Sequence, residues 1–184
     1  LGHPSLYDAR RAELSRILRR YLEAEIELNE ALFERRKKAF GMLRTGVERH
    51  EVEFDDVVIE RAGVRFRLRG RMDRVEVGID ERLGADAAVF RAAVDYKTSE
   101  ASTPGGGDGR AWDDDVVIQV PLYAHALERL EPGARVARVE YRALKTGKIV
   151  HSLELHRVGK SGQLEEDDDA RAKDERALAA AAGH

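Results

Sequence analysis

Cysteine is absent from all 184 residues, which excludes disulfide bonds, thiolate zinc sites and cysteine-held iron–sulfur clusters within this segment. Apolar runs are short. No stretch approaches the length of about 18 residues that a membrane-spanning helix needs, so the sequence predicts no such helix. A phosphate-binding loop is missing as well, because the first glycine of that motif would fall at Glu154 before Gly159-Lys160-Ser161. The histidines lack zinc-ligand spacing. We therefore expect no ATP site and no zinc centre within these residues.

The composition predicts a soluble globular domain. Hydrophobic residues make up 42% of the chain and charged residues 36%, and 184 residues suffice to bury a core. The chain starts without methionine and ends in an alanine-rich stretch, so we expect residues 1–184 to be a single domain excised from a longer protein. The lack of cysteine agrees with a cytoplasmic location, which we take as the expectation.

The net charge of −3 hides a local concentration of positive charge. Acidic residues gather at 113–115 and 165–169. Clustered arginines suit contact with phosphates. The alternative is that arginines at alternate positions form one solvated face of a strand. The six arginines to which both interpretations apply are Arg61, Arg65, Arg67, Arg69, Arg71 and Arg74.

Hydrophobic periodicity predicts a mixed sheet flanked by helices, an α/β layer fold. A helix is predicted from residue 7, with an apolar stripe that includes Leu14, Leu18 and Leu22. Pro121 requires the second helix to begin late or to kink. The expected elements are a helix at 7–40, strands at 51–60, 63–78 and 88–97, a hairpin connection at 81–87, a mobile loop at 98–112, a helix at 114–130, strands at 135–144 and 149–157 joined by a turn at 145–148, and a helix at 163–182.

The strand at 63–78 changes phase in its middle. Apolar residues occupy even positions as far as Met72 and odd positions from Val75 onward. Because the side chains of a strand alternate with a period of two, this change requires a bend or bulge beside Asp73. Such an irregularity either aims Asp73 at a site or lets the strand twist away from the core, and the sequence favours neither.

Two carboxylates and a lysine stand on neighbouring predicted strands. Asp73 precedes the hairpin connection, and Asp95 follows it, with Lys97 two residues further on the same face. Two hard oxygen ligands suit Mg²⁺ or Mn²⁺, and an ammonium beside them suits the charge that develops on a phosphate. Gln119 and Tyr123 are four residues apart, so they share one helix face. Alone, an Asp-X-Lys triplet is more often an ion pair at a strand end.

Taken together, these pieces resemble the nuclease domain of the RecB and AddB type, within the PD-(D/E)XK superfamily. The resemblance covers most of the chain and implies a restriction-endonuclease-like fold. It implies that Asp73 and Asp95 bind the metal, that Lys97 is catalytic, and that Gln119 and Tyr123 contact the DNA. The neighbouring arginines, Arg71 and Arg74, are predicted to contact substrate too. The matching pieces are Gly-Arg-Met-Asp-Arg at 70–74, Asp-Tyr-Lys-Thr at 95–98 and Gln-Val-Pro-Leu-Tyr at 119–123.

The resemblance implies a Mg²⁺- or Mn²⁺-dependent deoxyribonuclease, an exonuclease that processes DNA ends in recombinational repair. It also implies a helicase motor in the same chain or in a partner subunit, and a metal-binding histidine that we expect upstream of this segment. The alternative is a catalytically inactive nuclease-fold module that binds single-stranded DNA or scaffolds a helicase complex. A nuclease acting on RNA is a further alternative, because the residues do not separate the two substrates.

Overall fold

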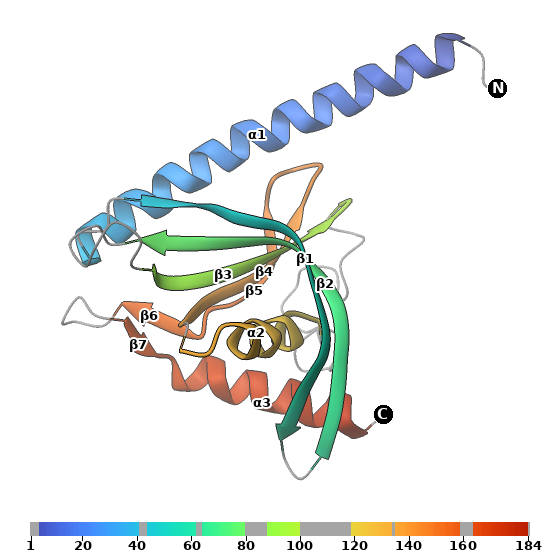
Figure 1. The fold of residues 1–184 in the computed structure, drawn as a ribbon. Coiled ribbons are helices and arrows are strands. Elements are labelled where there is room, and N and C mark those ends of the chain that lie inside the picture. The colour runs from blue at the N-terminus through green and yellow to red at the C-terminus, as the bar shows by residue number, and fades with distance from the viewer. Residues whose placement is uncertain are drawn as a thin grey trace.

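The computed structural model describes residues 4–40, 44–61, 64–79, 88–99, 119–133, 135–158 and 164–183. It confirms the predicted mixed sheet flanked by helices (Figure 1). Of the predicted connections, 81–87 and all of 98–112 except Thr98 and Ser99 lie outside the described residues. The elements are α1 (Pro4–Phe40), β1 (Arg44–Arg61), β2 (Val64–Ile79), β3 (Ala88–Lys97), α2 (Gln119–Leu130), β4 (Val136–Ala143), β5 (Ile149–Leu153), β6 (His156–Val158), β7 (Leu164–Glu166) and α3 (Asp168–Gly183).

The main sheet has five strands in the order β1-β2-β3-β4-β5. Its neighbours are antiparallel except β3 and β4, which run parallel. Helix α1 lies over one face, and α2 and α3 lie on the other (Figure 1). The core fills the space between α2 and the sheet, where Val120, Ala124 and Leu127 pack with Val75 and Val139. Their spacing in α2 is that of one helix face, so burial of this face fixes α2 against the strands.

Helix α2 begins at Gln119 in the described part of the chain, and the predicted start at 114 lies outside it. Pro121 therefore falls in the first turn. Backbone N–H groups of a first turn have no partner within the helix, so a proline there removes nothing. The proline is buried, and it fits the start of the helix without a kink being required.

The C-terminal region differs from the prediction. The strand predicted at 149–157 divides into β5 and β6, and β6 pairs with β7 in a separate two-stranded sheet. The last helix starts at Asp168 and not at 163. Asp167 caps it, because its Oδ1 accepts a hydrogen bond from the backbone N of Ala170 at 3.1 Å. An aspartate before an acidic first turn is a helix-start signal that the periodicity alone does not reveal.

The predicted core stripe of α1 is wrong for three of its leucines. Leu14, Leu18 and Leu22 are exposed, whereas Tyr21 and Glu25 are buried. Tyr21 and Glu25 lie on the helix face that meets the sheet, whereas Leu18 and Leu22 lie on another face of the same turns. The N-terminal part of α1 projects past the sheet (Figure 1). Despite its length, α1 is not apolar enough to cross a membrane, and neither is any other helix in the described ranges.

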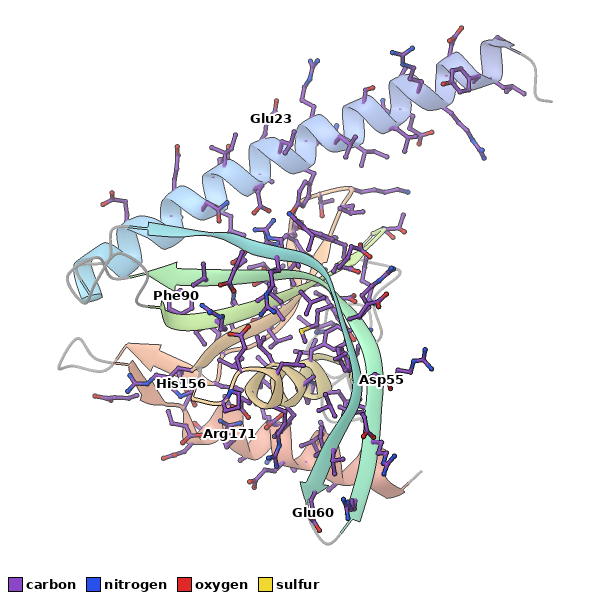
Figure 2. All side chains as sticks on the ribbon, in the orientation of Figure 1. Glu23, Asp55, Glu60, Phe90, His156 and Arg171 are labelled. Carbon is purple, nitrogen blue, oxygen red and sulfur yellow. The ribbon has the colours of Figure 1, made fainter. Side chains whose placement is uncertain are left out.

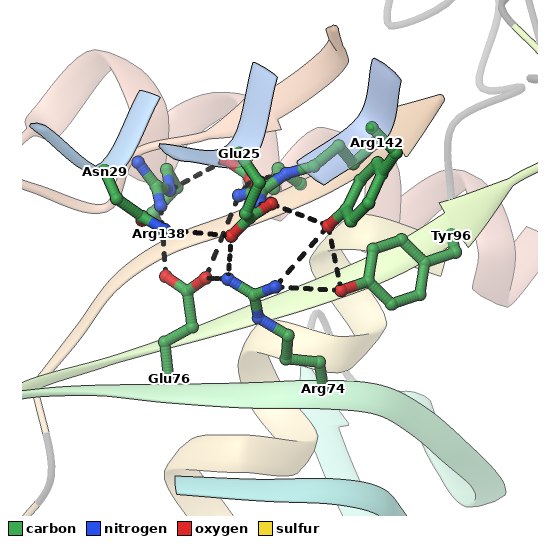
Figure 3. Close-up of polar contacts among 9 residues, drawn as sticks. Glu25, Asn29, Arg74, Glu76, Tyr96, Arg138 and Arg142 are labelled. Atoms are coloured by element: carbon green, nitrogen blue, oxygen red, sulfur yellow. Dashed lines mark hydrogen bonds and ion pairs between the residues drawn. The ribbon is translucent and has the colours of Figure 1, made fainter. Parts of the chain in front are cut away.

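Helix α1 is attached to the sheet through a buried ionic cluster (Figure 3). Glu25 binds the guanidinium of Arg74, 2.5 Å away, and that of Arg142. Tyr21 donates a hydrogen bond to Glu25 over 2.6 Å. We call this group the α1 ion cluster. It balances three carboxylates against three guanidiniums, those of Glu25, Glu76, Glu140, Arg74, Arg138 and Arg142.

Strands β1 and β2 continue beyond the rest of the sheet as a two-stranded arm. The β2–β3 ladder ends at Arg74↔Val94, whereas β1 and β2 stay paired as far as Arg61↔Val64. We define the β1–β2 arm as residues 51–61 and 64–73. It curves around the side of α2 (Figure 1). Because β3 is missing from this part, one edge of β2 has no strand beside it among the described residues.

The phase change predicted beside Asp73 is present at the base of the arm. Met72 and Val75 are both buried in the core around α2, although they have opposite parity. Arg74 faces the other way and binds Glu25 beneath α1. The irregular backbone lies on the partner strand, where Glu51 has a φ of 52°. The sheet therefore bends at Asp73, which turns the arm over α2.

The predicted turn between β4 and β5 supports a stability prediction. Gly147 has a φ of 70°, and a Cβ there would overlap the Cβ of Ala24 in α1. We expect Gly147→Ala to lower the free energy of unfolding by about 2 kcal/mol or more, from backbone strain and overpacking together. Gly133→Ala is the control, because Gly133 has a φ of 89° but open space around it. Urea titration measures both, and equal losses would show that contact with α1 contributes nothing.

Candidate active site

The two predicted carboxylates meet where the sheet divides. Asp73 and Asp95 would form the next pair after Arg74↔Val94, which is the last pair of the β2–β3 ladder. Here β2 turns into the arm while β3 continues beside β4. Asp73 Oδ2 accepts a hydrogen bond from the backbone N of Tyr96 at 2.8 Å. The carboxylate thus replaces the backbone partner that β3 loses, and this fixes Asp73 beside Asp95.

Lys97 completes this group on the same strand face as Asp95. Its Nζ lies 2.6 Å from Asp95 Oδ2. It also donates a hydrogen bond to Gln119 Oε1, 3.1 Å away on α2. The lysine side chain is mostly buried while the Asp95 side chain is almost fully so. The ammonium is therefore held at a defined position between Asp95 and Gln119.

Gln119 and Tyr123 connect α2 to β2 and β3. Gln119 Nε2 donates a hydrogen bond to the Tyr123 hydroxyl at 2.5 Å. That hydroxyl lies 2.9 Å from the carbonyl oxygen of Arg71 and 3.4 Å from Asp95 Oδ1. It has a single proton to donate, so the shorter contact with Arg71 is the stronger bond. Tyr123 therefore donates to a β2 carbonyl that lies beyond the end of the β2–β3 ladder.

Burial and neighbouring charges shift the pKa values of these groups. Burial raises the pKa of Asp95, Lys97 opposes the rise, and the charge of Asp73 adds to it. Burial, followed by the negative charge of Asp95, raises the pKa of Tyr123 to about 12. The hydroxyl of Tyr123 therefore keeps its proton at neutral pH and remains a donor. A carboxylate whose pKa is raised by burial and by a second carboxylate is stabilised in its ionised form when a cation binds beside it.

The donor atoms fit a hard divalent cation. Asp95 Oδ2 is buried and accepts no well-oriented hydrogen bond from the described residues, although Lys97 stands beside it. Asp73 is partly exposed, so the pair is open on one side. Within the described ranges, no three histidine, cysteine, aspartate or glutamate side chains gather as a metal site. A pair of carboxylates with room for water and substrate oxygens suits Mg²⁺ better than an all-protein site does.

The structure brings five predicted residues together, namely Asp73, Asp95, Lys97, Gln119 and Tyr123. The prediction for Arg74 is corrected. Its side chain is buried and engaged with Glu25 and Glu76 in the α1 ion cluster, so it is not available to a DNA phosphate. Adjacent strand residues point to opposite faces, which is why Asp73 and Arg74 separate.

Arg71 stays near the group without joining it. Its guanidinium is more than half exposed and lies 2.7 Å from Glu51, while its carbonyl binds Tyr123. Its predicted contact with substrate remains a prediction.

Tyr141 is a site residue that the sequence did not reveal. Its hydroxyl donates to Gln119 Oε1 at 3.2 Å, and its ring centroid lies 4.7 Å from Lys97 Nζ. The parallel pairing of β3 with β4 puts Tyr141 beside Asp95. Alternation within β4 shows which face it occupies, but only the pairing of the strands shows that this face meets Lys97. An aromatic face next to an ammonium stabilises the charged form.

Comparison with known proteins agrees with this arrangement. No curated protein sequence matches the chain significantly. A family model described as the PD-(D/E)XK nuclease superfamily matches residues 3–183, which is nearly the whole chain. The match includes all the residues that meet at the division of the sheet. The fold, the paired carboxylates with their lysine, and this match together show that the chain belongs to the PD-(D/E)XK nuclease superfamily.

Proposed function

We propose that this chain is a metal-dependent DNA nuclease domain, with Asp73, Asp95 and Lys97 as its catalytic residues. The observation that carries the proposal is the ammonium of Lys97, held 2.6 Å from Asp95 where the two carboxylate-bearing strands part. Membership of the superfamily supports metal-dependent nuclease activity. The substrate, the ion and the individual roles are our proposals.

Each side chain has a defined task. Asp73 and Asp95 would hold Mg²⁺ or Mn²⁺, which when bound polarises a phosphoryl oxygen and lowers the pKa of a bound water. Lys97 presents positive charge where negative charge grows on the phosphate, and its fixed position avoids reorganisation during the reaction. Gln119 and Tyr123 hold Lys97 and the base of the arm in place through their hydrogen bonds, and they would contact the DNA strand beside the metal site.

The finer assignment rests on the resemblance to RecB and AddB nuclease domains. It supports an exonuclease that acts on DNA ends in recombinational repair, alongside a helicase motor in the same chain or a partner subunit. The absence of cysteine agrees with a cytoplasmic location. The intact set of Asp73, Asp95 and Lys97 favours this function over a module that binds single-stranded DNA without cutting it, because each member of the set has a distinct chemical task.

The test is cleavage of end-labelled DNA. We expect single-stranded DNA to be degraded with Mg²⁺ or Mn²⁺ and not with EDTA, and Lys97→Ala to slow degradation by about 10²-fold or more through loss of transition-state charge stabilisation. Lys145→Ala, in the exposed β4–β5 turn, is the matched control and keeps full activity. Binding of DNA without any metal-dependent cleavage would instead identify the non-catalytic module, and preference for RNA would overturn the assignment of the substrate.

A further inference from the structure

We propose that the outer face of the β1–β2 arm is a binding track for single-stranded DNA, along which four arginines hold successive phosphates and lead the strand to Asp73. The arginines are Arg65, Arg67, Arg69 and Arg71. The track rests on the proposed function for the position of the bond to be cut, since it leads to the paired carboxylates. The evidence for the track itself is the arrangement of side chains on the surface of the arm.

The four arginines occupy alternate positions of β2, so they share one face. All four are exposed. The opposite face is the one that packs on the core, because Leu68 and Met72 lie against the buried cluster around α2. Asp73 follows Arg71 at the next alternate position, where the strand bends and its two faces change over. The row of guanidiniums therefore points away from the core and ends at a proposed catalytic carboxylate.

The geometry of a strand suits the backbone of a nucleic acid. Alternate residues of a β-strand are roughly 7 Å apart, so the row from Arg65 to Arg71 spans roughly 20 Å. This interval is comparable with the distance between successive phosphates in an extended single strand. The edge of β2 along this row has no neighbouring strand among the described residues, since the β2–β3 ladder stops at Arg74↔Val94. A DNA strand thus reaches the row directly from the division of the sheet.

The surface of the arm is hollow at the end of the arginine row nearest Asp73. A depression of about 480 Å³ lies there, within the range of pockets that hold small ligands. From β2 it is lined by Arg69 and Arg71, which we call the arginine wall, and from β1 by Glu53, Phe54 and Asp55. Gly70 contributes backbone without a side chain. The depression offers space for one nucleotide, with its phosphate against the arginine wall.

Acidic residues run beside the arginines on β1, and Asp55 and Glu60 mark this row in Figure 2. Two cross-strand ion pairs result. Arg67 lies 3.1 Å from Asp56, and Arg71 lies 2.7 Å from Glu51. All four of these side chains are more than half exposed, so the pairs contribute little free energy and a phosphate readily replaces them.

The other two arginines are unpaired within the part of the chain that the structure describes: no acid there forms an ion pair with Arg65 or Arg69. The arginine row lies on the side of β3 and the site, whereas the acids lie on the far side. The acids therefore repel a DNA backbone from the β1 side and confine it to the β2 row.

The experiment measures binding in EDTA, so that its result does not depend on cleavage. A fluorescently labelled oligothymidine is titrated with the protein, and anisotropy is followed over a range of salt concentrations. We expect the combined variant Arg65→Gln, Arg67→Gln, Arg69→Gln to bind at least tenfold more weakly. Because each lost phosphate contact removes about 0.7 from the slope of log K against log salt for a single strand, the slope should fall by about 2.

The control variant has the same change in net charge. It replaces three exposed arginines far from the arm by glutamine and should bind like the unaltered protein. Its residues are Arg10 near the N-terminal end of α1, Arg129 at the end of α2 and Arg135 just before β4. A second variant, Glu53→Gln with Asp55→Asn, should bind more tightly, because it removes repulsion beside the track. A melting curve of each variant verifies folding, and exposed positions such as these should change it little.

The outcomes separate this proposal from the proposed function. If the arm variant and the control bind equally, with equal salt slopes, the arginines are only a solvated ion-pair row and the track does not exist, even where Mg²⁺-dependent cleavage is present. If Glu53→Gln with Asp55→Asn weakens binding, the acid row does not confine the strand and the track is overturned too. If the arm variant alone loses affinity, the track stands, whether or not the protein cuts DNA.

Discussion

Asp95→Asn is expected to abolish metal-dependent cleavage while leaving the fold intact. The substitution keeps the shape of the side chain but removes one of the two negative charges that would hold the cation. If the ion supplies about 4 kcal/mol of transition-state stabilisation, its loss slows cleavage about 10³-fold. Asp95 is only 5% exposed, and burial raises its pKa. Its ionised form therefore costs stability when no cation is bound, so the variant should melt in EDTA at the same temperature or higher.

Thermal melting with and without Mn²⁺ measures both the stability of Asp95→Asn and its ability to bind the cation. Mn²⁺ should raise the melting temperature of the unaltered protein, since a ligand that binds only the folded state stabilises it. It should not raise that of Asp95→Asn. Asp168→Asn, on an exposed residue at the start of α3, is the control and should retain the shift. A variant at Asp95 that keeps both the shift and the cleavage rate would remove Asp95 from the metal site.

Glu25→Ala is expected to cost about 3–5 kcal/mol of unfolding free energy, because it leaves buried charge without its partner. Glu25 is the carboxylate by which α1 binds Arg74 and Arg142, and both guanidiniums are buried. Tyr21 would lose its acceptor as well. Glu23→Ala is the matched control, since Glu23 is exposed two residues earlier on the same helix (Figure 2). Equal urea midpoints for the two variants would show that the ion cluster does not stabilise α1.

The same residue gives the stability a defined pH dependence. Burial alone would raise the pKa of Glu25, but hydrogen bonds from Arg74 and Tyr21 and the charge of Arg142 outweigh it and lower the pKa from 4.5 to about 2. A carboxylate whose pKa falls on folding contributes stability above its unfolded pKa. That stability is lost as the pH falls from about 4.5 towards 2. Glu25→Gln should flatten this part of the pH profile, and an unchanged slope would contradict the shift.

Those parts of the site that follow from local spacing could be predicted. Alternation along a strand places Asp95 and Lys97 on one face, and helical spacing places Gln119 beside Tyr123. The phase change at Asp73 was also readable, because a strand cannot switch its buried face without bending. These features depend on neighbours in the chain, and the structure has them all.

What could not be predicted depends on pairing between distant segments. Tyr141 meets Lys97 only because β4 lies parallel beside β3. Arg74 looked like its neighbour Arg71, but α1 covers one and leaves the other exposed. The leucines of α1 matched an apolar stripe, but the face that meets the sheet is the one with Tyr21 and Glu25. In each case the sequence does not show which distant segment packs against the residue in question.

Tyr96 stands between Asp95 and Lys97 and belongs to both sides of the sheet. Its backbone N binds Asp73 on one side, and its hydroxyl accepts a bond from Arg74 at 2.9 Å on the other, 3.1 Å from the hydroxyl of Tyr21. Tyr96 thus connects the residues that hold α1 on the sheet to Asp73 and to the strand that carries Asp95. A shift of α1 along the sheet would therefore be transmitted through Arg74 and Tyr96 to the strand that carries Asp95 and Lys97, although α1 itself lies on the opposite face of the sheet.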